Sequence, residues 1–129
     1  MKRQWAILMI GLLAAGCDPA SRAKGYIEAM RTDDEQRYYQ AADQLRHLLH
    51  TDPEAIPATT AALADPDYRV RAGAAYGLGA DLCNVHPYPT DRVAPALTGV
   101  LGDGDPAARI SAANSRATLH RPDPKVLAV

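Results

Sequence analysis

The 129-residue sequence contains no phenylalanine, one tryptophan and only two cysteines. Two cysteines cannot form the disulfide framework that small secreted domains with little core require. Charge of one sign is not in excess either, because 14 Lys and Arg stand against 15 Asp and Glu. Nucleic-acid binding depends on clustered Lys and Arg, so the composition gives no reason to expect a nucleic-acid partner. The length fits one small domain.

The first sixteen residues have the three zones of an export signal. Lys2 and Arg3 precede an apolar stretch from Trp5 to Ala15, which ends in small residues. This stretch of about eleven residues is shorter than the roughly 20 residues that a membrane-spanning helix needs. We therefore expect residues 1–16 to be a signal peptide that is removed on export.

The end of this segment, Leu13-Ala14-Ala15-Gly16-Cys17, resembles the lipobox of bacterial lipoproteins. The resemblance implies cleavage after Gly16 and acyl chains such as palmitate on Cys17. Each buried methylene contributes about 0.8 kcal/mol, so several chains would hold the protein at a membrane. Asp18 resembles the signal that retains lipoproteins in the inner membrane, which favours its periplasmic face, with the outer membrane as the alternative. An ordinary secretory signal with a chance cysteine is the other interpretation.

The predicted mature chain has few large aliphatic residues with which to build a core. After residue 16 it contains ten Leu, three Ile, six Val and one Met, with 12 basic and 15 acidic residues. Alanine makes up part of the missing volume, which suits helices that pack closely side by side. We expect the tyrosines to be the large core fillers, namely Tyr26, Tyr38, Tyr39, Tyr68 and Tyr76.

The sequence also repeats itself. Residues 54–79 and 92–117 are identical at nine of 26 positions when they are aligned at an offset of 38. A weaker copy lies upstream at an offset of 33, where Asp34 corresponds to Asp67. Periods in this range are typical of helical solenoids, in which one unit cannot bury its own apolar face and stacks on a neighbour. We therefore expect three units of two helices each.

The third unit shows the pattern of two helices and a tight turn most clearly. Apolar residues fall on one helical stripe that predicts a buried face, including Leu101: Val93, Ala96, Leu97, Val100 and Leu101. Gly102-Asp103-Gly104 ends this helix. Asp105-Pro106 begins the next, because Asp accepts from free N–H groups and Pro in the first turn loses no hydrogen bond. The corresponding turns are Asp65-Pro66-Asp67 in unit two and Thr32-Asp33-Asp34 in unit one.

The segment from Ala62 to Gly79 contains an aliphatic residue, an acidic turn, Val-Arg, Ala-Ala and Leu-Gly in that order. In this it resembles HEAT-like repeats, particularly those of phycobilisome-lyase-type proteins. The resemblance implies an all-α fold, a short solenoid of about three two-helix repeats. It also implies that the turn aspartates and the following arginines lie in the groove between repeats, where Asp67, Arg71, Asp105 and Arg109 would pair with neighbours. Asp65 and Asp103 are assigned to the same turns and groove. Gly77 and Gly79 are interpreted as a helix stop.

Four segments are therefore predicted: a lipoprotein signal peptide at 1–16, a lipidated N-terminus and linker at 17–25, the repeat domain at 26–120 and a proline-containing tail at 121–129. Units two and three are joined by a loop from Ala80 to Thr90, whose two prolines oppose helix.

That loop holds Cys83 and His86, three residues apart. A zinc site needs about four protein ligands, or three and a water, and the neighbouring sequence does not supply the rest. No Gly-x-Ser-x-Gly turn, phosphate-binding glycine loop or His-Glu-x-x-His helix occurs. We expect no cofactor or metal, and a non-catalytic module that binds a protein or peptide in the envelope. The alternative is a small accessory enzyme or metal-handling protein that uses the Cys83/His86 loop.

Arg69 is the residue we expect to contact a partner. Guanidinium groups bind carboxylates in a bidentate manner. Arg71 recurs in unit three as Arg109, whereas Ala107 occupies the position of Arg69. We therefore expect Arg69 to face the partner and Arg71 to connect repeats.

Overall fold

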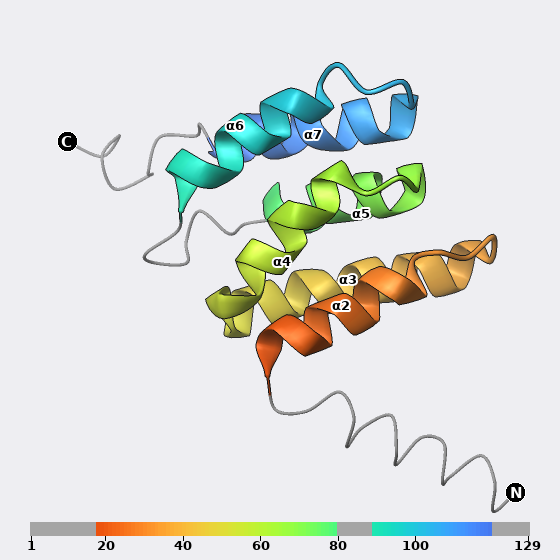
Figure 1. Cartoon of the computed structure of the whole chain (residues 1–129). Coiled ribbons are helices and arrows are strands. Elements are labelled where there is room, and N and C mark those ends of the chain that lie inside the picture. Colours follow the sequence, from red (N-terminus) through yellow and green to blue (C-terminus); the bar gives the residue numbers. More distant parts are fainter. Residues whose placement is uncertain (1–17, 80–88, 120–129) are drawn as a thin grey trace, which may run out of the picture.

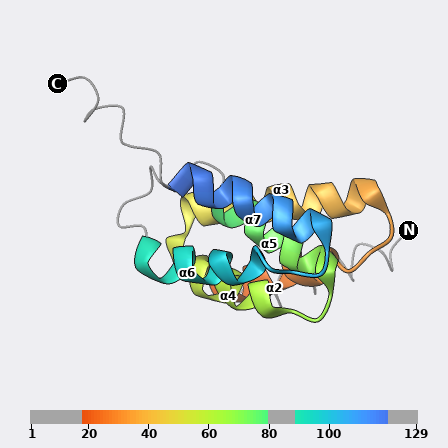
Figure 2. The same ribbon diagram turned by 90° about the horizontal axis from the view of Figure 1, so that it is seen from above.

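A computed structural model of the chain describes residues 18–79 and 89–119. Its helices form three antiparallel pairs stacked along one direction (Figure 1). Viewed from above, the pairs form two layers, with α2, α4 and α6 in one and α3, α5 and α7 in the other (Figure 2). The elements are α2 (Pro19–Ala29), α3 (Glu35–Thr51), η1 (Pro53–Ala55), α4 (Ile56–Ala61), η2 (Ala62–Ala64), α5 (Tyr68–Gly79), α6 (Thr90–Val100) and α7 (Pro106–Leu119), where η marks a short 3₁₀ helix. The predicted all-α, three-unit solenoid is confirmed.

The two helices of each unit are joined by the same hydrogen-bonded turn. Asp65 Oδ1 accepts from the backbone N–H of Asp67, and Asp103 Oδ1 accepts from that of Asp105, both at 2.9 Å. Thr32 Oγ1 plays this part in unit one, because it accepts from the Asp34 N–H at 3.1 Å. A side chain that binds the backbone two residues onward fixes a tight turn.

The second aspartate of each turn then caps the following helix. Asp34 Oδ1 accepts from the Arg37 N–H at 3.2 Å, and Asp67 Oδ1 accepts from the Arg69 N–H at 2.9 Å. Asp105 Oδ1 accepts from the Ala107 N–H at 2.9 Å. These contacts satisfy N–H groups that have no partner within the helix, as the sequence predicted.

The first helix begins earlier than expected. We assigned residues 17–25 to a linker, but α2 starts at Pro19 and Ala23 is fully buried in the core. Asp18 caps this helix by accepting from Ser21 Oγ at 3.0 Å and from the Ser21 N–H at 3.2 Å. These hydrogen bonds hold the pKa of Asp18 below its usual range. Small residues weaken the apolar pattern of α2, so the Asp-Pro start signal was the only strong indication.

The core lies between the two layers, and aliphatic side chains rather than tyrosines fill it. The fully buried large residues are Met30, Leu45, Leu49, Ile56, Val70, Leu78, Val93 and Leu97. Tyr26 and Tyr38 pack against this core from its margin. The other three expected core tyrosines, Tyr39, Tyr68 and Tyr76, are exposed at 61%, 49% and 44%. Their assignment to the core was wrong.

Leu101 is also outside the core, with 39% of its surface exposed. Its repeat counterpart Leu63 is 5% exposed, because it faces Val100 and the rest of unit three across the stack. On the other side of unit three, the described residues contain no fourth unit. The predicted burial of Leu101 was therefore wrong, because no further unit covers this residue at the end of the described stack.

Helix α5 is the middle helix of its layer and packs with different faces on α3 and α7. A Cβ atom on Gly73 would overlap the Met30 thioether, and one on Gly77 would lie 3.5 Å from Leu49 Cδ1. On the side of α7, the Ser115 hydroxyl donates to the Ala75 carbonyl at 2.5 Å. A Cβ on Gly79 would overlap the backbone of Ser115. Gly77 and Gly79 thus permit close packing, and α5 ends at Gly79, in agreement with their interpretation as a helix stop.

Candidate functional site

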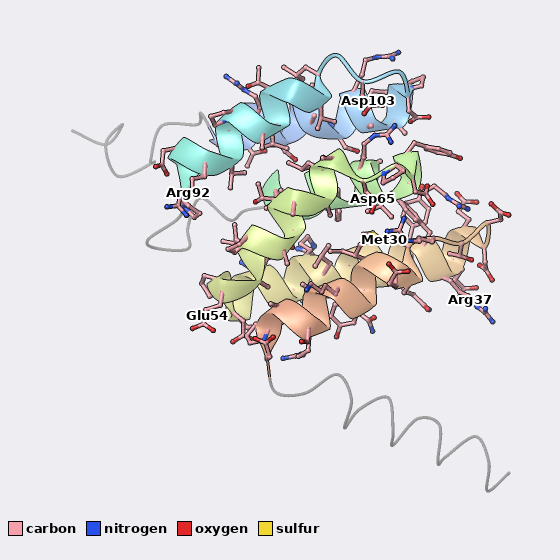
Figure 3. All side chains as sticks on the ribbon, viewed as in Figure 1. Met30, Arg37, Glu54, Asp65, Arg92 and Asp103 are labelled. Carbon is pink, nitrogen blue, oxygen red and sulfur yellow. The ribbon has the colours of Figure 1, made fainter. Side chains whose placement is uncertain are left out.

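The three turns lie side by side at one edge of the stack, which we call the turn edge: residues 31–34, 65–67 and 101–105. Figure 3 shows Asp65 and Asp103 at this edge, whereas Glu54 and Arg92 lie at the opposite one. The turns coincide there because each unit reverses direction at the same point of the repeat.

Two arginines connect neighbouring turns through bidentate ion pairs. Arg31 donates from Nη1 and Nη2 to the two oxygens of Asp65 at 2.7 and 2.6 Å. Arg71 donates from Nε and Nη2 to those of Asp103 at 2.6 and 2.9 Å. Hydrogen bonds from these guanidinium groups hold the pKa of Asp65 and of Asp103 below the usual range. The turn edge thus links unit one to unit two and unit two to unit three.

The pairing expected from the family resemblance is correct for some residues and wrong for others. Arg71 does pair between units, with Asp103, and the pair of Asp65 with Arg31 also joins two units, although the expected pairing named neither of these aspartates. Asp67 instead binds Arg69 of its own unit, and Asp105 caps its own helix. The expected inter-repeat role of Arg109 is not seen either, because its Nη1 donates to the Asp103 carbonyl of its own turn at 2.7 Å. Arg109 lies in the last described unit, so no next turn is available to it.

Arg69 is held by two carboxylates. Its Nη1 donates to Asp33 Oδ1 at 2.6 Å, across the boundary to unit one. Its Nη2 and Nε donate to the Asp67 oxygens at 3.0 and 3.1 Å, and the Arg69 hydrogen bonds hold the pKa of Asp67 below its usual range. The Arg69 side chain is 27% exposed. A partner's carboxylate would have to compete with both aspartates.

Exposed tyrosines gather on the outer side of the α3–α5–α7 layer, which we call the tyrosine face: Tyr39, Tyr68 and Tyr76. Tyr68, Ala72 and Tyr76 are spaced by four residues, so they share one side of α5. Tyr76 Oη lies 3.5 Å from Asp43 Oδ1 of α3, which places the two helices together on this face. This is an aromatic surface that the protein leaves open to solvent.

At its turn-edge end, the tyrosine face contains a pocket of about 240 Å³. Its lining residues come from all three units: Thr32, Asp33, Glu35, Tyr38, Tyr39, Tyr68, Arg69, Ala72 and Ala107. Pockets for small-molecule ligands typically measure about 300–1,000 Å³. The volume is therefore at the small end for a ligand pocket and is suited to one large side chain.

Tyr38 forms the rigid wall of this pocket. Its hydroxyl donates to the Arg69 carbonyl at 3.0 Å, and its ring meets that of Tyr39 edge to face, with centroids 5.5 Å apart. Burial, together with nearby Tyr39, Asp105 and Asp67, raises the pKa of Tyr38 to about 12. The hydroxyl therefore stays neutral and keeps its hydrogen bond at physiological pH.

Sequence reasoning missed the tyrosine face, although a signal for it exists. Val70, Ala74 and Leu78 are buried on one side of α5 at the same spacing of four. Tyr68 and Tyr76 fall between these positions on the other side of the helix. Assigning tyrosines to the core by size alone overrode this periodicity.

Several predicted site residues lie outside the described residues: Gly16, Cys17, Cys83 and His86. Lipid attachment and metal handling by the Cys83/His86 loop remain predictions. Within residues 18–79 and 89–119, no three His, Cys, Asp or Glu side chains are grouped to hold a metal ion. No helix in the same ranges is long and apolar enough to cross a membrane.

Residues 23–115 match the family described as HEAT repeats. The chain is a HEAT-repeat protein. The match runs from α2 to α7 and so includes all three units of the stack. HEAT repeats generally mediate protein–protein interaction, and the family is typically non-catalytic. No curated protein and no solved structure matches the chain.

Proposed function

We propose that this HEAT-repeat protein is a lipid-anchored, non-catalytic module of the bacterial cell envelope that binds a partner protein over its tyrosine face. The supporting observation is the exposure of Tyr39, Tyr68 and Tyr76 on adjacent helices. Tyrosine is enriched at protein interfaces, because its ring offers a large contact area and its hydroxyl tolerates water. Repeat stacks present such extended surfaces to their partners.

The anchoring part of the proposal rests on the sequence. Cys17 follows a signal-like segment and ends a lipobox-like motif, and Asp18 favours the inner membrane. The resemblance to phycobilisome-lyase-type repeats concerns the repeat pattern, and we propose no lyase activity. The partner is therefore sought among envelope proteins at the periplasmic face of the inner membrane.

Substitutions on two sides of α3 and α5 test the binding face. Tyr39→Ser with Tyr76→Ser removes two exposed rings, whereas Gln40→Ser with Gln44→Ser changes exposed residues on another side of α3. The partner is crosslinked in intact membranes and recovered by affinity purification. We expect recovery with the tyrosine variant to fall about thirtyfold, because two interface tyrosines of about 1 kcal/mol each contribute about 2 kcal/mol together. The glutamine variant should retain the partner. Equal recovery by both variants at equal folded fraction would place the interface elsewhere.

Mass spectrometry of the mature protein tests the anchor. The wild-type N-terminal peptide should begin at Cys17 and carry acyl chains, and Cys17→Ser should leave an unprocessed or unlipidated chain. A mature wild-type protein without acyl mass on Cys17 would remove the anchoring half of the proposal and leave the binding face untouched.

A further inference from the structure

The pocket at the turn-edge end of the tyrosine face lies among carboxylates. Asp33 and Glu35 line it. Asp67 adjoins it through its ion pair with Arg69, and Asp105 adjoins it by capping the N–H of Ala107, a lining residue. The one cation lining the pocket is Arg69, whose charge is offset by Asp33 and Asp67. The lining of the pocket itself carries two carboxylates and one guanidinium, so it is negative by one charge.

The acidic groups are also the more accessible ones. The Asp33 side chain is fully exposed at 102%, whereas that of Arg69 is 27% exposed. Glu35 is exposed at the first position of α3, and among the described residues it forms no ion pair. An incoming charged group would therefore meet carboxylates before it meets the guanidinium.

The walls of the pocket suit a long cationic side chain. Tyr39 and Tyr68 expose their rings there, and a cation within about 6 Å of a tyrosine ring is attracted to its face. The exposed Ala107 offers a small apolar surface, against which the methylene stem of Lys or Arg can pack, and Ala72 lies buried beneath the pocket lining. Aromatic rings, apolar floor and acidic rim come together in a volume that fits one side chain.

We propose that this pocket receives a Lys or Arg side chain of the partner protein, held between Tyr39 and Tyr68 with its charge facing Asp33 and Glu35. The inference rests on the proposed function and adds the chemistry of the partner's contact residue. It reverses the charge expected from the sequence, because the guanidinium of Arg69 is already bound by two aspartates.

Capped tripeptides Gly-X-Gly, with X as lysine, norleucine or glutamate, serve as probes for the pocket. We expect the lysine probe to shift the backbone amide resonances of residues 32–39 and 68–72 of the mature protein in detergent micelles, with saturation in the millimolar range. The norleucine probe has the same stem without the charge, and should bind at least threefold more weakly. Binding of the lysine probe should weaken further as salt is raised, since exposed charges are screened.

Paired variants separate the pocket from the rest of the face. Glu35→Gln and Tyr39→Leu should each weaken the lysine probe about twofold to fivefold, in line with the modest strength of exposed cation–π and ionic contacts. Asp43→Asn in α3 and Tyr76→Leu in α5 lie outside the pocket lining and should leave the affinity for the lysine probe unchanged. All four positions are exposed, so the folded state should persist, as melting curves can check.

Norleucine binding equal to lysine binding would overturn the charge preference, and tighter glutamate binding would restore Arg69 as the recognising group. Absence of saturable shifts with all three probes would overturn the pocket as a side-chain site. In each of these cases, loss of the crosslinked partner with Tyr39→Ser and Tyr76→Ser would still support the tyrosine face. The two proposals can therefore fail separately.

Discussion

The two sides of α5 show two ways of joining neighbouring repeats. Toward unit one, Gly73 and Gly77 form shallow notches that large flexible side chains fill, notably Met30 and Leu45. Toward unit three, Gly79 lies against the backbone of Ser115, and small residues bring α5 and α7 close together. The first interface can adjust by rotating side chains, whereas the second can adjust only by separating two helices.

The two interfaces differ in how their helices pack, whereas the ion pairs at the turn edge are alike at both. Arg31 with Asp65 and Arg71 with Asp103 form the same bidentate contact at both boundaries. Similar ion pairs therefore accompany dissimilar packing, so substitutions can separate the two contributions.

The largest effect is expected from Leu45→Ala. Leu45 is fully buried and packs near the Gly77 notch. Removing its side chain leaves a cavity between units one and two and should lower the free energy of unfolding by about 2–5 kcal/mol. Denaturant unfolding followed by circular dichroism measures it. Ile110→Ala, at a position 62% exposed, is the matched control and should change little; comparable losses would contradict the assigned core.

Gly79→Ala tests the interface of α5 with α7. The added Cβ would overlap the Ser115 backbone, which no rotamer change can relieve. We expect a loss of about 1–3 kcal/mol in the free energy of unfolding. The control is Gly99→Ala, because Gly99 lies within α6 with open space around it and alanine favours helix by about 0.5–1 kcal/mol. A stabilising Gly79→Ala would show that the two helices are not in close contact.

Low pH should weaken the ion pairs at both boundaries between units, because it protonates the carboxylates of Asp65 and Asp103. The folded-state pKa of Asp65 and of Asp103 lies below the unfolded value of about 3.9. Their contribution is therefore present above this pH and is lost as the pH falls below about 4. We expect the melting temperature to drop over that range, and Asp65→Asn or Asp103→Asn to flatten the decline. A profile that is unchanged in both variants would assign the acid sensitivity to other groups.

Gly73→Ala should have a smaller effect than Gly79→Ala, although both add one methyl group. Its Cβ would meet mainly the end of the Met30 side chain, which can move aside. The helix-favouring effect of alanine offsets part of the strain, so the net change should stay below about 1 kcal/mol. Thermal melts of the two variants in parallel give the comparison, and equal destabilisation would remove the proposed difference between the interfaces.

Leu101→Ala is expected to have the smallest effect. A core position in this repeat would lose about 2–5 kcal/mol on truncation. Because Leu101 is 39% exposed at the end of the stack, we expect less than about 1 kcal/mol. A loss above about 2 kcal/mol in denaturant unfolding would mean that this end of unit three is covered.

Local rules predicted the turns well because the relevant contacts span only a few residues. Asp34, Asp67 and Asp105 cap helices as their positions before each helix indicated. The ion pair between Arg31 and Asp65 was not predictable in this way, since Arg31 has no arginine counterpart in the repeat alignment. Its partner is determined by how the units stack.

The pocket at the turn-edge end of the tyrosine face could not be predicted from the sequence, for a related reason. Its wall residue Tyr38 and its rim residue Glu35 come from unit one, Arg69 comes from unit two and its floor residue Ala107 comes from unit three. Such a site exists only after the units stack, and no single segment encodes it. The exposure of Leu101 has the same origin, because a repeat pattern does not mark where a stack stops.

Because Asp18 caps α2, this helix begins directly after the proposed lipid anchor, which limits how far the domain can extend from the membrane. A flexible tether of n residues would let a domain sample about 5–6 Å times the square root of n around its anchor. Here α2 begins at Pro19, two residues after the proposed lipid-bearing Cys17, so almost no tether remains. The eleven residues of α2 place the turn edge and the pocket about 16 Å further along the helix axis. Under the proposed anchoring of Cys17, the pocket would therefore stay close to the bilayer, within reach of partners that present a basic side chain near the membrane surface.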